Sequence, residues 1–278
     1  MIEPEEPIAE MTPEEAARFR EMEEGLEYPP PPTEAEMREI EAQGRSLREP
    51  PVSDVNLEVP YIHQLWDTAN NFNGEYACGA ASSTMVLAYY GLLEPKPFTA
   101  SKPQPHESPY GWYVSNPFTH SGRTFDQSAG TPSNGKAQGI YGTALDYVSG
   151  MGWVAIPGSK GGKKGVIPVL ESFMTPVENQ VEVIWKPTQE DVKASLDEGH
   201  PVIISGNVFG WGHLIVVRGY YYDPNTKLYG WIVNDPYGYR VGRAHDGDNV
   251  VYLWREIYKP DGLTTKYMFR IRGAYKPA

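Results

Sequence analysis

The residues best suited to chemistry are one cysteine and one histidine that lie far apart in the sequence. Cys78 is the only cysteine among 278 residues, and it precedes a Gly where a loop is expected to become a helix. A thiolate, not a thiol, attacks a carbonyl carbon, and the N–H groups of a helix start favour the thiolate. Cys78 is therefore either the nucleophile of an enzyme or the inert buried thiol that free cysteine usually is.

A nucleophilic cysteine needs a base beside it and a group that orients the base. Of six histidines, only His213 opens a strongly β-forming run behind small residues, in GWGHLIVVRGY, although such a histidine is often just a hydrogen-bonded strand-end residue. Asn234 and Asp235 follow the next predicted strand at a hairpin distance, and only one of them can face His213 because strand neighbours point to opposite faces. Gln64 offers an amide for an oxyanion, beside the backbone N–H of Cys78.

Several elements are predicted to position these residues. A helix over 79–90, ended by Gly91, follows Cys78, and Thr188 caps a second helix that Gly199 ends. Further helical patterns occupy 140–149 and 166–174, and residues 94–138 resemble a long loop insertion. The predicted strands are 57–64, 201–205, 213–222, 228–235 and 266–275. A helix-rich first half followed by an antiparallel sheet predicts an α+β fold.

Residues 1–55 form an acidic, proline-punctuated arm ahead of a body that spans 56–278. Two short helices are predicted in the arm, capped by Thr12 and Thr33, with the stiff spacer YPPPP between them. The arm has too few apolar residues to fold alone, so we expect it to be disordered or docked on the body or on a partner protein.

Charge excludes some classes of function. The net charge is −12, and residues 1–50 hold 15 acidic against 5 basic residues, which leaves 21 acidic and 19 basic residues in the nearly neutral remainder. Neither part offers the basic surface that nucleic acid requires. We also expect no membrane span and no secretory signal, which favours a cytoplasmic or virion-associated location over secretion by a signal peptide.

The sequence predicts neither a metal nor an organic cofactor. The segment DTANNFNG, residues 67–74, lacks the Gly and the acid that a calcium loop has at its sixth and twelfth positions. His63, His106 and His120 do not have zinc-ligand spacing. Three aromatic residues are candidates for lining a substrate cleft: Trp112, Tyr113 and Trp211.

The motifs around these residues resemble a known family. A Gln before Cys-Gly, a helix ending in Tyr-Tyr-Gly, and the segments LDEGHPVIIS, GHLIVVRGY and NDPYG are similar to the papain-like bacteriocin-processing peptidases, family C thirty-nine, and their relatives. The resemblance covers residues 57–275 in outline. It implies Cys78 as nucleophile, His213 as general base, Asp235 as orienting group and Gln64 in the oxyanion hole. The family often has Pro after Cys-Gly where this chain has Ala80, a mild departure.

The resemblance also implies a fold and a function. The fold would have a helical lobe that carries the nucleophile and a lobe built on an antiparallel sheet. The activity would be that of a cysteine peptidase or amide hydrolase with a Cys-His-Asp triad, acting on a peptide, a cell-wall crosspeptide or a protein. A hydrolase with an acidic arm and no expected secretory signal would fit a role in phage lysis or in a virion. No transporter segment follows the domain, so the leader-processing exporter role is not carried over. The alternative is a structural or binding module that keeps the peptidase fold without turnover.

Overall fold

The computed structural model describes residues 54–69, 72, 74–75, 77–116, 118–120, 123–125, 170, 173, 181–208, 211–223, 228–242, 244–257 and 267–272. The first part holds α3 and short elements: β1 (Val55–Asn56), α3 (Cys78–Tyr89), β2 (Phe98–Ala100), β3 (His106–Ser108), α4 (Trp112–Ser115), β4 (Phe118–His120) and β5 (Arg123–Phe125). The second part holds most of the sheet: β6 (Val181–Trp185), α7 (Gln189–Asp197), β7 (Val202–Val208), β8 (Trp211–Asp223), β9 (Leu228–Asn234), η1 (Tyr239–Val241), β10 (Val250–Leu253), α8 (Trp254–Ile257) and β11 (Tyr267–Ile271).

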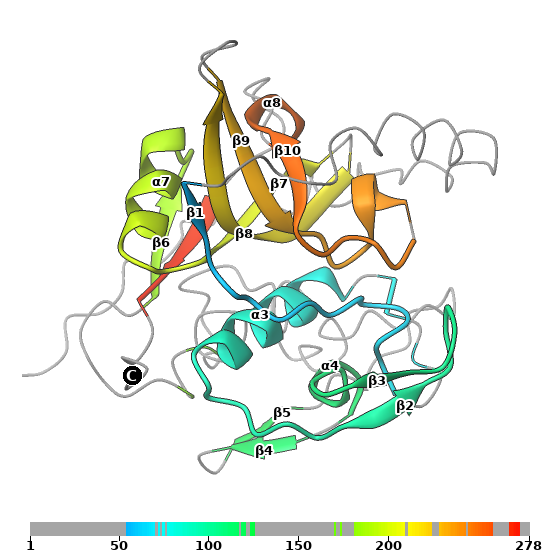
Figure 1. Ribbon diagram of the computed structural model, residues 1–278. Helices are drawn as coiled ribbons and strands as arrows, with labels where there is room; N and C mark the ends of the chain where they lie inside the picture. The colour runs from blue at the N-terminus through cyan, green and yellow to red at the C-terminus, as the bar shows by residue number, and fades with distance from the viewer. Residues whose placement is uncertain are drawn as a thin grey trace, which may run out of the picture.

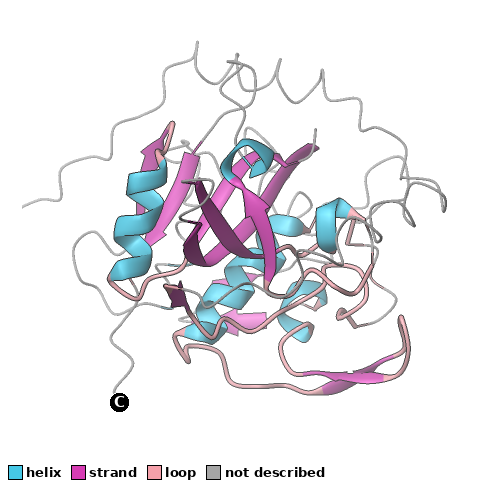
Figure 2. Cartoon of the chain, turned by 45° about the horizontal axis from the view of Figure 1, so that its top comes forward, coloured by secondary structure: helices cyan, strands magenta, loops and turns pink. Residues whose placement is uncertain are grey.

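An antiparallel sheet of seven strands organises the described chain. Its order is β10-β9-β8-β7-β11-β6, and β1 pairs with β8. In Figure 1 the sheet, α7 and α8 form one lobe, and α3, α4 and the hairpins β2–β3 and β4–β5 form a second lobe on the other side. The turned view in Figure 2 keeps this division. The arrangement is consistent with the predicted α+β class.

Alternation along the strands gives the sheet two buried faces. Ile203, Leu214 and Val216 belong to the core shared with α3, whereas Ile204, Ile215 and Val217 belong to the core shared with α7 and α8. A shift of one residue in β8 would therefore exchange the two cores, so its register is strongly specified.

Helix α3 lies close to the sheet because its first turns carry small residues. Gly79 through Ala88 are all buried, and the hydroxyl of Ser82 donates a hydrogen bond to the Leu214 carbonyl on β8 at 3.2 Å. Gly91, with φ of +68°, follows the end of the helix in the left-handed conformation that glycine adopts easily. The predicted helix over 79–90 differs from the observed one by one residue at each end.

The structure confirms some of the other predicted elements and corrects the rest. Helix α7 has the predicted capping box between Thr188 and Asp191, and the predicted strands from 201 onward correspond to β7, β8, β9 and β11. The predicted strand over 57–64 is wrong: β1 ends at Asn56, and none of residues 57–64 is in a strand. The Leu57 N–H still donates to the Arg218 carbonyl at 2.9 Å, but Pro60 cannot donate to a ladder. The predicted loop over 94–138 contains β2, β3, α4, β4 and β5 within its described residues.

Some predictions concern parts of the chain outside the described residues. These are the helices of the arm, the pattern at 140–149 and, apart from helical Leu170 and Phe173, the pattern at 166–174. Among the described helices, each is too short or too polar to cross a membrane.

Candidate active site

Cys78 and His213 come together where the start of α3 meets β8. Cys78 is the first residue of α3 and is partly exposed, while His213 on β8 is 5% exposed. The two side chains are close enough for Cys78 to contribute to the raised pKa of His213. Ser82 and Leu214 join the same helix and strand through the bond described above, one turn after Cys78 and one residue after His213. This hydrogen bond therefore fixes the distance between α3 and β8 close to Cys78 and His213.

The imidazole of His213 is held from both ends. Its Nε2 lies 2.7 Å from Oδ1 of Asp235, so Nδ1 is the ring nitrogen that remains available to the Cys78 thiol. Burial lowers the pKa of His213, but the charge and hydrogen bond of Asp235, together with Cys78, outweigh burial and raise that pKa to about 10. The imidazolium is therefore the favoured form near neutral pH, and it can stabilise a thiolate beside it.

Asp235 is fixed by hydrogen bonds on every side. Besides His213, Oδ1 accepts the backbone N–H of Tyr237 at 2.9 Å, and Oδ2 accepts the Tyr252 hydroxyl at 2.6 Å. The Asp235 side chain is fully buried, and its backbone N–H donates to the Gly247 carbonyl at 2.8 Å. The carboxylate has little freedom, so it can hold His213 in one orientation and one tautomer.

Asn234 points the opposite way and belongs to a structural network. Its amide nitrogen donates to the carbonyls of Val59 and Pro60, and its oxygen accepts from the Arg218 guanidinium and the Asn249 backbone N–H. Of the two candidate orienting groups, Asp235 is thus the one that contacts His213.

Gln64 lies in the loop ahead of α3 and braces the chain before Cys78. Its amide nitrogen donates to the carbonyls of Gly74 at 2.7 Å and Glu75 at 3.0 Å. Its backbone N–H donates to the Pro236 carbonyl at 2.8 Å, which ties this loop to the residue after Asp235. The side-chain oxygen is buried and has no hydrogen-bond partner among the described residues.

Three tyrosines of this site were not predicted from the sequence. The Tyr237 ring packs edge-on against His213, with 6.2 Å between ring centroids, and Tyr252 and Tyr61 donate to the carboxylate and the carbonyl of Asp235. The Asp-Pro-Tyr turn signals the contact of Asp235 with the Tyr237 backbone, because an Asp side chain often accepts the N–H two residues on. Tyr252 lies on β10, a strand that was not predicted, so the sequence carried no signal for it.

A cavity of about 650 Å³ borders the segment between Gln64 and Cys78. Trp112, one of the predicted cleft residues, lines it, whereas Tyr113 is buried in the core and its hydroxyl donates to the Glu94 carbonyl. The side chain of Trp211 is outside the described residues. The other lining residues are Leu65, Trp66, Thr68, Ala69, Phe72, Phe98, Thr99, Ala100, Ser101, Lys102 and Asn116.

Comparison with known proteins places this geometry in a family. The model of the Peptidase_C39 like family matches residues 56–259, which include the helix start, strands β6 to β10 and all four predicted site residues. No curated protein and no solved structure matches the chain. The family match covers well over half of the sequence and agrees with the resemblance seen in the motifs. The chain belongs to the peptidase C thirty-nine-like family.

Proposed function

We propose that this protein is a cysteine peptidase or amide hydrolase that acts through Cys78, His213 and Asp235. The observation that carries the proposal is the continuous run of side-chain contacts from the thiol through the imidazole to the buried carboxylate. The position of Cys78 at the first residue of a twelve-residue helix adds support, because the helix dipole favours a negative charge on the sulfur.

The proposed reaction begins with attack of the Cys78 thiolate on the carbonyl carbon of an amide. The tetrahedral intermediate collapses as the His213 imidazolium gives its proton to the departing amine, which leaves a thioester on Cys78. Neutral His213 then removes a proton from water, the hydroxide attacks the thioester, and the carboxylic acid product leaves as the thiol is restored. Asp235 keeps the ring oriented through both steps.

The oxyanion of the intermediate requires hydrogen-bond donors. The backbone N–H of Cys78 lies in the first turn of α3, where N–H groups have no intrahelical acceptor. We propose Gln64 as the second donor, with one amide hydrogen turning from the Gly74 or Glu75 carbonyl to the oxyanion when substrate is bound. In this role Gln64 both braces the loop and completes the site.

The substrate class proposed is a peptide, a cell-wall crosspeptide or an exposed segment of a protein, as a phage lysis or virion-associated enzyme would cleave. The cavity lined by Trp66, Phe98 and Trp112 supports binding of a substrate side chain. Under this proposal residues 1–55 remain a separate arm, and the body from residue 56 carries the activity.

Turnover by the full chain tests the proposal. The protein is incubated with a library of unstructured peptides and with purified peptidoglycan, and new termini are identified by mass spectrometry. We expect amide cleavage in at least one substrate set, and its loss in the Cys78→Ala variant, which keeps the fold. Absence of turnover in both sets would contradict the hydrolase and favour a binding module that retains the peptidase fold.

A further inference from the structure

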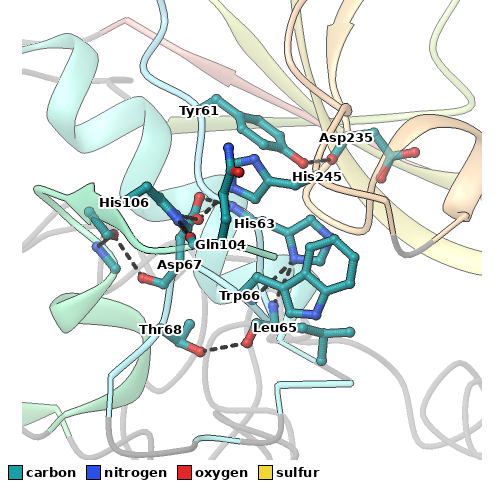
Figure 3. A network of polar contacts seen from close by, with 12 residues as sticks. Tyr61, His63, Leu65, Trp66, Asp67, Thr68, Gln104, His106, Asp235 and His245 are labelled. Carbon is teal, nitrogen blue, oxygen red and sulfur yellow. Dashed lines mark hydrogen bonds and ion pairs between the residues drawn. The ribbon is translucent and has the colours of Figure 1, made fainter. Parts of the chain in front are cut away.

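A second cluster of polar side chains lies outside the run of contacts from Cys78 to Asp235. Asp67, His106 and His245 come from three distant segments: the loop before α3, the start of β3 and the loop between η1 and β10. Oδ1 of Asp67 lies 2.6 Å from Nε2 of each histidine, and the three ligand atoms all lie within 4.8 Å of one another. Figure 3 shows both imidazoles directed at this carboxylate.

The hydrogen bonds of His106 determine what its Nε2 can do. Nδ1 of His106 lies 2.8 Å from the Gln104 carbonyl oxygen, and a carbonyl oxygen only accepts, so Nδ1 carries the hydrogen. In a neutral ring Nε2 then presents a lone pair to a carboxylate oxygen that also presents lone pairs. A cation between the two atoms, either a proton or a metal ion, removes the repulsion. An Nδ1–H bonded to a backbone carbonyl is the usual support of a histidine that ligates a metal through Nε2.

The carboxylate is also pre-arranged. Oδ2 of Asp67 accepts the His63 backbone N–H at 2.7 Å, and the Asp67 carbonyl accepts the Ser108 hydroxyl at 2.8 Å. The Asp67 side chain is only 7% exposed, and Oδ1 is left to face the two histidines. A buried carboxylate held this way has a strong requirement for positive charge at Oδ1.

Aromatic packing fixes the third ligand. The His245 ring stacks on the buried His63 ring, with centroids 5.6 Å apart, and Tyr61 meets it edge-on at the same centroid distance. Figure 3 shows Tyr61 reaching from His245 to Asp235, whose carbonyl accepts the Tyr61 hydroxyl at 3.0 Å. The ring of His245 thus keeps its orientation without depending on the cation.

We propose that Asp67, His106 and His245 bind one divalent transition-metal ion, with Zn²⁺ the best fit, through a carboxylate oxygen and two imidazole Nε2 atoms. Two imidazoles and one carboxylate suit Zn²⁺ and disfavour the hard ions Mg²⁺ and Ca²⁺. Ligand atoms around a tetrahedral Zn²⁺ lie roughly 3.3 Å apart. Side-chain movements of about 1 Å bring the three atoms to that spacing, and the fourth position is left for water.

The bound metal would link the two lobes. His106 belongs to the β2–β3 hairpin, on the same side of the molecule as α3 (Figure 1). His245 precedes Gly247, whose carbonyl accepts the Asp235 N–H from the sheet side. The three segments that carry the ligands are therefore joined at a point that supports the backbone of Asp235. The metal site does not require Cys78 to be catalytic.

Metal titration of the full chain tests the proposal. The protein is made as Cys78→Ala, so that the thiol cannot bind the ion, and is freed of any polyhistidine tag and stripped with a chelator. We expect one equivalent of Zn²⁺ to bind, with Co²⁺ giving the visible absorption of a low-symmetry nitrogen and oxygen site. At a free Zn²⁺ concentration about 100 times Kd, the Tm should rise by about 5–10 °C.

Ligand variants locate the ion. His106→Gln and His245→Gln, each added to Cys78→Ala, should lower Zn²⁺ affinity at least about 100-fold. His120→Gln is the matched control, because His120 stacks on Phe173 and is not one of the three clustered ligands, so this variant should leave affinity unchanged. If a variant fails to fold by circular dichroism, histidine side-chain NMR of the Cys78→Ala protein shows which imidazoles shift on adding Zn²⁺.

Any of three results would overturn the proposal. The first is the binding of neither Zn²⁺ nor Co²⁺ by the Cys78→Ala protein at metal concentrations below about 10 μM, which corresponds to about −7 kcal/mol. The second is unchanged Zn²⁺ affinity in both ligand variants, and the third is a set of NMR shifts confined to other histidines. The cluster would then be a hydrogen-bond network held together by a proton.

Discussion

At the scale of single residues, the site depends on how Asp235 is confined. Both carboxylate oxygens accept hydrogen bonds, and the His213 imidazole lies between this fixed charge and the Cys78 thiol. In a buried environment a nearby carboxylate favours the imidazolium strongly, because little solvent screens the pair. The chemistry proposed for Cys78 therefore depends on the charge of Asp235 as much as on the position of its carboxylate.

Asp235→Asn should move the pH dependence of hydrolysis. The pKa of His213 is raised from 6.5 to about 10, so the stability that its charge brings is fully present below pH 6.5 and is lost as pH rises through about 10. Asparagine keeps an oxygen acceptor but removes the charge, so the pKa of His213 should fall and the alkaline limb of kcat/KM should move to lower pH. Asn234→Ala is the control: it should lower the free energy of unfolding without moving that limb. An alkaline limb that stays in place in Asp235→Asn would contradict this role.

The Gln64→Ala variant distinguishes two roles of Gln64: hydrogen-bonding the oxyanion and holding the loop before Cys78 in place. Loss of an oxyanion donor should lower kcat about 10²-fold. Alkylation of Cys78 by iodoacetamide forms no oxyanion, so its rate should stay within about twofold of the unaltered protein. Equal losses in both measurements would mean that Gln64 only holds the loop through Gly74 and Glu75.

At the scale of elements, the approach of α3 to β8 decides whether Cys78 meets His213. Small residues allow the close approach, and the bond from Ser82 to the Leu214 carbonyl spans it. Ser83, the next residue, is also buried, but its hydroxyl has no hydrogen-bond partner in the described part of the chain. The two neighbouring serines therefore make a matched pair for measuring the value of the contact.

Ser82→Ala should lower the free energy of unfolding by about 1 kcal/mol, because it removes a buried hydrogen bond. Ser83→Ala should be neutral or slightly stabilising, since it removes a buried polar group that is not hydrogen-bonded. Urea unfolding of both variants measures the difference. A Ser83→Ala cost equal to that of Ser82→Ala would refute the link between α3 and β8.

Local signals account for the elements that could be predicted. The cap at Thr188, the glycine after α3 and the alternating apolar residues of β7 and β8 are all encoded within short segments. The spacing of His213 and Asp235 follows from a hairpin, which is also a local structure. Their meeting with Cys78 was predicted by motif order and by resemblance, because no short-range pattern brings α3 to β8.

Contacts made by irregular loops could not be predicted in the same way. Asp67, His106 and His245 lie far apart in the sequence and follow no metal-ligand motif, so only the folded loops bring them together. Tyr252 reaches Asp235 from β10, whose pairing with β9 is a long-range feature of the sheet. For residues 57–64 the sequence predicted a strand that the structure lacks. The segment contains β-forming residues, but Pro60 cannot donate a hydrogen bond to a neighbouring strand.

At the scale of the whole molecule, charge separates the N-terminal arm from the body. Residues 1–50 carry 15 acidic and 5 basic residues, whereas the remaining chain carries 21 and 19. The family match begins at residue 56, beyond this acidic segment. A nearly neutral body gives no strong electrostatic reason for the arm to dock on it, so we propose that the arm anchors the protein to a partner.

Deletion of residues 1–50 should leave the body folded and its hydrolytic activity close to that of the full chain, because Gln64, Cys78, His213 and Asp235 all lie beyond the cut. The check is a comparison of circular dichroism, Tm and kcat/KM for the two proteins. A rise in activity of at least about tenfold, equivalent to ~1.4 kcal/mol in the barrier, would identify the arm as an inhibitory segment and would exclude the anchor role.

The rate at which iodoacetamide alkylates Cys78 near neutral pH tests the central claim most directly. The protein has one cysteine, so the labelling stoichiometry is unambiguous. We predict complete labelling of one thiol per chain, at a rate at least about tenfold above that of a free thiol with its ordinary pKa. His213→Ala should lose that acceleration, whereas the matched His120→Ala should keep it. A Cys78 that reacts no faster than a free thiol, or whose rate is the same without His213, would contradict the account.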